Sequence, residues 1–314
     1  MGGVAARAYR RRTDHRRAGP AARVAAGLAL GLALGLIGGC LGPEEAVPPG
    51  REAVRTVPLA EPDALMAAVT RVVPMDLRPR ERGLFVRRDE TGAVWSASPM
   101  NGFDLTGLSW RGGRAALITD RHVVFAAHVP QPKVGGTLTF YDRDGWPITR
   151  TLARRAVLPR LRGVDLDVAV GRLDAPVPAG VAVYALPGID PVAMGMMARG
   201  DVPVVVTFAR GGKGQNDEPG WGAFASVSRL DAVTAGGARV IYARDTSALS
   251  DRQAEHAALW GDSGSASFLA QDDALLLLSH YHTSQGAGAG PNYADPDVQR
   301  LLRDAVETLD AEGR

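Results

Sequence analysis

A serine lies between glycines in the stretch Trp260-Gly261-Asp262-Ser263-Gly264, whose residue types suit acyl transfer. A hydroxyl attacks a carbonyl efficiently only when a base accepts its proton and backbone N–H groups stabilise the oxyanion that forms. Flanking glycines permit a tight turn in which a substrate carbonyl can approach the backbone closely. We therefore predict Ser263 as a nucleophile, with the N–H groups of Gly261 and Ser263 as the oxyanion hole.

A histidine and an aspartate occur upstream, each at the end of a predicted strand. His128 lies near the end of the apolar run 123–129, and Asp167 opens an alternating run. Acyl transfer also needs an imidazole to take the proton of the serine and a carboxylate to hold that imidazole in the required tautomer. Asp165 competes with Asp167, since period-2 spacing puts both on one strand face, but the apolar pattern registers on Asp167.

Taken together, these motifs resemble those of the trypsin/chymotrypsin-like serine peptidases. Gly261-Asp262-Ser263-Gly264 matches the family's nucleophile motif, Ala126-Ala127-His128 matches its "AAH" segment, and Asp167-Val168-Ala169 is similar to the start of its "DIALLRL" strand. The order His, Asp, Ser also agrees with this family and differs from subtilisins and α/β-hydrolases. The resemblance covers about residues 108–309 and implies a serine endopeptidase that uses an acyl-enzyme and needs no cofactor. It implies that His128 is the general base for Ser263 and that Asp167 orients His128.

The resemblance also implies residues that contact a peptide substrate. Ser279-His280-Tyr281 is similar to part of the "VVSWG" strand, which lines the cleft and pairs with the substrate backbone. Ala257 stands six positions before the nucleophile, where the family places the floor of its specificity pocket. Cleavage after Arg or Lys is then disfavoured, unless Glu255 or His256 reaches the pocket. No "IVGG"-like start precedes the first strands, so activation by cleavage is not expected, and Asp262 must find another partner.

The remaining histidines of this region have other expected roles. His280 and His282 share one strand face and are candidate metal ligands, but no third ligand occurs nearby at a spacing typical of metal-binding motifs. We therefore predict no metal site. His122 lies in a turn before the apolar run and is expected to be solvated.

The first 39 residues have the features of a lipoprotein signal peptide. Seven arginines and one aspartate precede Val24, a net charge of +6, which leaves −4 for the rest of a chain whose total is +2. The basic charge thus belongs to a targeting segment, and the remainder has no electrostatic footprint for nucleic acid. The apolar run 24–39 is shorter than the ~20 residues that a membrane-spanning helix needs.

Ile37-Gly38-Gly39-Cys40 ends this run and resembles the lipobox of bacterial lipoproteins. The resemblance implies that Cys40, the only cysteine, is lipidated and anchors the protein at the bacterial cell envelope, facing the periplasm or the exterior. In a Gram-negative cell, Leu41 in place of an aspartate indicates the outer membrane. An uncleaved membrane anchor is the alternative.

The rest of the chain predicts an all-β fold with a C-terminal helix. Short alternating runs joined by turn residues fill residues 85–283, including an Asp-Gly hairpin signal at 141–145. Apolar residues at helical spacing after Asp295-Pro296 predict a helix capped by Asp295. The resemblance implies two antiparallel six-stranded β-barrels of the chymotrypsin type within residues 85–314, divided near residue 185. Residues 40–84 are predicted as a Pro-rich tether, extended to about Leu59, and one short helix over 61–73.

Two other classes of function remain open. The chain could be a trypsin-fold protein that has lost turnover and acts as a lipid-anchored binding module, or an envelope structural protein in which the motifs occur by chance. Reaction of Ser263 with a fluorophosphonate distinguishes an enzyme from both, because only an activated serine is labelled.

Overall fold

The structure of the chain is a computed structural model, which divides into two units, Met1–Glu44 and Glu45–Arg314. All the described residues lie in the second unit: 51–72, 83–88, 92–95, 102–200, 202–210, 222–243, 263–282 and 288–313. The predicted signal peptide, Cys40, Ala257, Gly261 and Asp262 lie outside them. Among the described residues, no helix combines the length and the apolar character that crossing a membrane requires.

Strands dominate the regular structure of the described residues, as the sequence predicts. The strands are β1 Thr56–Pro58, β2 Gly83–Arg88, β3 Gly92–Trp95, β4 Leu108–Ser109, β5 Ala115–Leu117, β6 His122–Ala126, β7 Thr137–Tyr141, β8 Pro147–Val157, β9 Val168–Leu173, β10 Leu186–Gly188, β11 Pro203–Arg210, β12 Gly222–Thr234, β13 Arg239–Ala243, β14 Ala266–Gln271, β15 Ala274–His280 and β16 Ala289–Pro291. The helices are α1 Pro62–Val72, α2 Pro191–Ala198 and α3 Pro296–Ala311, with a short 3-10 turn at Ala235–Gly237.

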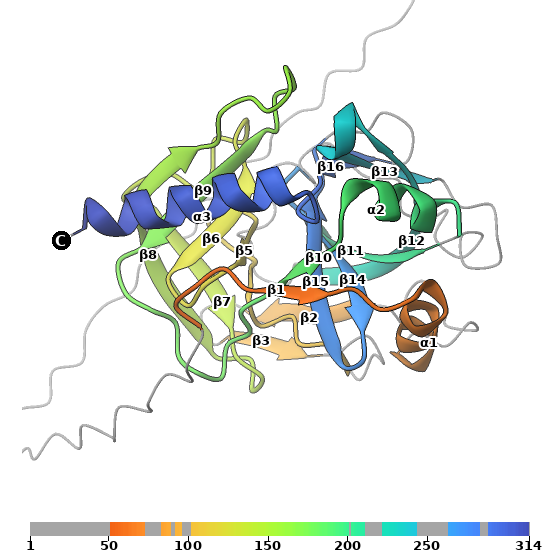
Figure 1. Cartoon of the computed structure of the whole chain (residues 1–314). Helices are drawn as coiled ribbons and strands as arrows, with labels where there is room; N and C mark the ends of the chain where they lie inside the picture. Colours follow the sequence, from red (N-terminus) through yellow and green to blue (C-terminus); the bar gives the residue numbers. More distant parts are fainter. Residues whose placement is uncertain are drawn as a thin grey trace, which may run out of the picture. The chain divides into compact units, whose positions relative to one another are not determined.

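Six antiparallel strands form the N-terminal sheet, in the order β4-β5-β6-β9-β8-β7, which lies on the left in Figure 1. β6 and β9 are rich in valine, and their side chains are buried almost throughout. The predicted hairpin is confirmed, because β7 and β8 pair in antiparallel register. In its turn, the side chain of Asp142 accepts hydrogen bonds from the N–H groups of Asp144 and Trp146. The two ends of the sheet also meet, since Trp110 N–H donates to the carbonyl of Thr139 at 3.0 Å.

The C-terminal sheet follows the antiparallel path β15-β14-β11-β12-β13-β16, with β2 paired to β12 and β3 paired to β2 (Figure 1). Its first and last strands approach one another, because Tyr293 N–H donates to Leu278 O and His282 N–H donates to Ala289 O, each at 2.9 Å. This six-strand path is therefore nearly closed.

Helix α3 begins next to the C-terminal sheet and runs across β8 and β9 of the N-terminal sheet (Figure 1). The carboxylate of Asp295 accepts hydrogen bonds from Asp297 N–H and Val298 N–H, which confirms the predicted cap. The apolar face is buried, and Arg172 of β9 pairs with Asp310 at 2.9 Å. The sequence thus predicts this helix and its buried face correctly.

The segment before α1 differs from the extended tether that the sequence predicts up to about Leu59. Strand β1 pairs in parallel with β10, and the buried guanidinium of Arg51 donates hydrogen bonds to the carbonyls of Pro178, Ala179 and Val181. Residues 51–59 therefore belong to the packed structure. The helix predicted over 61–73 is confirmed as α1, which buries Leu65, Ala68 and Val69.

Candidate functional site

Strand pairing brings His128 and Asp167 together. The antiparallel register of β6 and β9 sets Ala126 opposite Val168, so the residues just after β6 face those just before β9. The pairing continues for one step beyond the strands, because Ala127 N–H donates to the carbonyl of Asp167 at 2.9 Å. His128 follows directly. The side chains of β6 and β9 are buried, so this register is set by the core and the two site residues have a rigid support.

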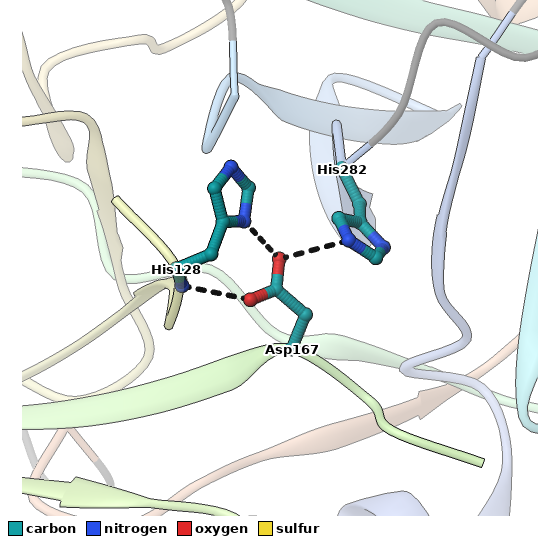
Figure 2. Close-up of side chains that lie close together, drawn as sticks. All are labelled: His128, Asp167 and His282. Atoms are coloured by element: carbon teal, nitrogen blue, oxygen red, sulfur yellow. Dashed lines mark hydrogen bonds and ion pairs between the residues drawn. The ribbon is translucent and has the colours of Figure 1, made fainter.

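The carboxylate of Asp167 binds His128 with both oxygens (Figure 2). Its Oδ2 lies 2.6 Å from Nδ1 of the imidazole, and its Oδ1 accepts the backbone N–H of His128 at 2.8 Å. The side chain of Asp167 is 7% exposed, whereas that of His128 is 45% exposed. Because the carboxylate accepts at Nδ1, the neutral ring carries its proton there, and Nε2 is free to accept another.

The backbone of Asp167 is held in the left-handed region, with φ of +55°, which is uncommon for a residue with a side chain. Its N–H donates to Oδ1 of Asp165 at 2.9 Å, and its carbonyl accepts from Ala127. Of the two carboxylates that the sequence leaves in competition, Asp167 contacts the imidazole and Asp165 supports the turn.

A buried histidine and tyrosine lie behind Asp167. Nε2 of His280 lies 3.2 Å from the carbonyl of Asp167, and its Nδ1 lies 2.6 Å from the hydroxyl of Tyr293. Burial lowers the pKa of His280 to about 4 and raises the pKa of Tyr293 well above its usual value. His280 is therefore neutral at pH 7, donates from Nε2 to the carbonyl and accepts at Nδ1 from the tyrosine hydroxyl.

His282 approaches the same carboxylate from the far side (Figure 2). Its Nε2 lies 3.5 Å from Oδ2 of Asp167, and its ring centroid lies 5.4 Å from that of His128. Burial is the largest cause that lowers the pKa of His282, while the charge of Asp167 opposes it. The predicted common face of His280 and His282 agrees with their shared approach to Asp167. The sequence does not reveal that His128 and Asp167 lie there too.

Ser263 is partly buried and precedes a glycine that packs against the end of β6. Gly264 has a φ of +88°, and a Cβ added to it would lie 3.2 Å from the carbonyl oxygen of Arg114 and 3.8 Å from the backbone nitrogen of Ala126. Ser263 therefore enters the neighbourhood of the 126–128 segment. These two described residues, Ser263 and His128, are not hydrogen-bonded to each other.

The other predicted site residues have mixed outcomes. Ser279 and His280 at the end of β15 and Tyr281 directly after it, predicted to line a substrate cleft, are each 4% exposed or less. Gly261 of the predicted oxyanion hole and Ala257 of the predicted pocket lie outside the described residues.

His122 is not solvated as the sequence predicts. It is the first residue of β6 and is buried, with Nδ1 2.8 Å from the hydroxyl of Thr119. Burial lowers the pKa of His122 to about 4. Its Nε2 lies 3.4 Å from Oδ1 of Asp310, so the described residues contain a second His-Asp pair, whose histidine is six residues from His128.

No protein-family model matches the chain, and no curated protein is significantly similar to it in sequence.

Proposed function

We propose that the protein is a serine endopeptidase of the trypsin/chymotrypsin-like kind, which cleaves peptide bonds through an acyl-enzyme. One observation carries the proposal: the 2.6 Å contact between Nδ1 of His128 and Oδ2 of Asp167, two residues that the motifs select as a base and its orienting carboxylate. The second oxygen accepts the backbone N–H of the same histidine, so the carboxylate is fixed at both oxygens. This is the support that a general base needs.

The chemistry follows from the proton positions. Oγ of Ser263 attacks the substrate carbonyl while Nε2 of His128 takes its proton, and the imidazolium that forms is stabilised by Asp167. His128 then returns the proton to the leaving amine. In the second half of the reaction, water attacks the acyl-enzyme while His128 takes its proton, and His128 then returns a proton to Oγ of Ser263. The backbone N–H groups of Gly261 and Ser263 stabilise the oxyanion in this proposal.

The proposed fold is two antiparallel six-stranded barrels of the chymotrypsin type. Each sheet contains a path of six strands. In each path, hydrogen bonds link the first strand, or the residues next to it, with the last strand or its neighbours, which supports the proposal. His128 follows β6 and Asp167 precedes β9 of the N-terminal sheet, whereas Ser263 precedes β14 of the C-terminal sheet. A cleft between two barrels would therefore draw its reacting groups from both.

The proposed location is the bacterial cell envelope, with a lipid anchor on Cys40 and a protein or peptide as substrate. The short apolar run and the lipobox-like residues before Cys40 support it. Mass spectrometry of the membrane fraction should find acylated Cys40 as the first residue, and finding an intact 24–41 segment in the mature protein would contradict the anchor.

A catalytically silent binding module of the same fold is the second candidate. It is favoured by one observation, that Ser263 and His128 are not hydrogen-bonded to each other. Catalytic hydrogen bonds are often long before substrate binds, so this geometry fits both candidates.

Labelling with a fluorophosphonate probe separates the two. An activated Ser263 should react, and the Ser263→Ala and His128→Ala proteins should each lose the reaction, because serine and base act as a unit. Equal labelling of wild-type and Ser263→Ala protein would show that another residue reacts. A lack of labelling in the wild type would leave the binding module as the better description.

A further inference from the structure

Three side chains that can bind metals converge at the candidate site. One ligand atom each from His128, Asp167 and His282 lies within 4.8 Å of the other two (Figure 2). His128 lies just after β6, Asp167 directly precedes β9 and His282 lies just after β15. The side chain of His128 is 45% exposed and that of His282 is 25% exposed, so a solvated cation can reach the cluster.

The proposed hydrolysis leaves His282 without a role. Its Nε2 faces Oδ2 of Asp167 at 3.5 Å, which is too long for a normal N–H···O hydrogen bond. Among the described residues, no side-chain hydrogen bond to the His282 ring is found. The ring is held near the carboxylate, tilted 42° from the ring of His128, and both nitrogens that face the carboxylate converge on one oxygen.

We propose that His128, Asp167 and His282 bind a divalent transition-metal ion, of which Zn²⁺ is the type, and that the bound ion switches the hydrolase off. Two imidazole nitrogens and one carboxylate oxygen form a donor set that suits zinc, with water as the fourth ligand. Ca²⁺ and Mg²⁺ prefer sites made of oxygen ligands, so they are not expected to compete. The binding of the metal does not depend on the proposed function, whereas the switch rests on it.

The switch follows from the tautomer of His128. The ion forms a bond to Nδ1, the atom that carries the proton in the hydrogen bond to Asp167. That N–H bond breaks, and the ring, which stays neutral, takes a proton from water at Nε2 while water receives the one from Nδ1. No proton is gained or lost overall. Nε2 then carries hydrogen and cannot accept the proton of Ser263, so metal binding and serine activation exclude each other.

The site is tested without reference to activity. Full-length protein is freed of metal with EDTA and dialysed, then titrated with Co²⁺, read by its visible absorption, and with Zn²⁺, read by calorimetry. Loss of the third ligand in His282→Ala should weaken binding by at least about tenfold, since even partners outside the ligand set typically contribute that much. An unchanged affinity in a folded His282→Ala protein, or no binding by the wild type, overturns the site.

The second His-Asp pair provides a matched control. Asp310→Asn removes a carboxylate 3.4 Å from His122, where the described residues offer no third ligand group of this kind. This variant should bind Zn²⁺ as the wild type does. If Asp310→Asn weakens binding as much as His282→Ala, the ion lies elsewhere and the proposal is wrong.

The switch is tested by fluorophosphonate labelling of Ser263. Saturating Zn²⁺ should suppress labelling, and EDTA should restore it. Labelling that proceeds at the same rate in the zinc-bound protein overturns the switch. If Ser263 is not labelled even in EDTA, the proposed function fails, and with it the switch, while the Co²⁺ titration still decides whether the metal site exists.

Discussion

At the scale of single residues, the role of each carboxylate in the site depends on the hydrogen bonds that its oxygens accept. Asp167 accepts two hydrogen bonds from His128, one from the ring and one from the backbone, while Asp165 only supports the turn before it. Two acidic residues two positions apart thus have different tasks. Substitution of each by its amide separates the tasks, because asparagine keeps the shape and one acceptor oxygen but adds a donor.

Asp167→Asn should reduce the rate of fluorophosphonate labelling by about four orders of magnitude, since an amide that donates to Nδ1 favours the unproductive tautomer. Asp165→Asn is the matched control. It retains an oxygen that can accept the N–H of Asp167, so the rate should fall less than about tenfold. Equal losses in the two variants would mean that Asp167 acts through the turn and not through the imidazole.

His128 and Asp167 could be predicted from the sequence because Ala126-Ala127-His128 and Asp167-Val168-Ala169 resemble segments of the trypsin-like peptidases, and the alternating apolar pattern favours Asp167 over Asp165. The approach of His282 could not be predicted in this way. It lies 115 positions after Asp167, and contact between different sheets leaves no periodic signal in either segment. The burial of His122 was missed because its position beside a polar turn suggested solvent.

At the scale of elements, α3 shows how a local signal and a distant contact combine. The cap that Asp295 provides was predicted from Asp295-Pro296, but its second partner was not. Oδ2 of this buried carboxylate accepts a hydrogen bond from Arg162 at 2.7 Å, across 133 positions of sequence. Strand β1 was also missed, since a three-residue strand that ends in Pro58 has no alternation to detect.

Asp295→Ala should lower the free energy of unfolding by about 2–3 kcal/mol, because the helix loses its cap and a buried charged hydrogen bond. The measurement is urea unfolding followed by circular dichroism. Asp297→Ala provides the control, since Asp297 also contacts Arg162 but is more exposed and does not cap the helix. Its loss should be smaller. A larger loss for Asp297→Ala would show that the ion pair outweighs the cap.

At the scale of the whole molecule, two buried neutral histidines link stability to pH. Burial holds the pKa values of His122 and His280 at about 4, whereas an unfolded chain has its histidines near 6.5. Above pH 6.5 both states are neutral and the fold keeps its full stability. As the pH falls from 6.5 towards 4, the unfolded state binds protons first, so stability is lost in this window.

The slope of the unfolding free energy against pH tests this link between the buried histidines and stability. Each histidine should contribute up to about 1.4 kcal/mol per pH unit to the loss of stability between pH 6 and 4.5. His122→Gln cannot titrate, so its unfolding free energy, measured by urea denaturation at several pH values, should fall less steeply by about that amount. Parallel pH profiles for wild type and His122→Gln would contradict the assignment of His122 as a buried neutral side chain.

The contacts of Asp167 also determine when, during synthesis, the site can exist. Asp167 leaves the ribosome about 100 residues before Ser263, His280 and His282, and α3 is the last helix to emerge. A nascent chain that ends before Ser263 already contains His128 and Asp167, next to the paired strands β6 and β9, but it has neither the serine nor the buried histidine that contacts the carbonyl of Asp167. For the proposed hydrolase, a chain that stops before Ser263 is therefore inert. The proposed hydrolytic activity would thus arise only after Ser263 and His280 have been synthesised, and partly made chains would not threaten the cell that makes them.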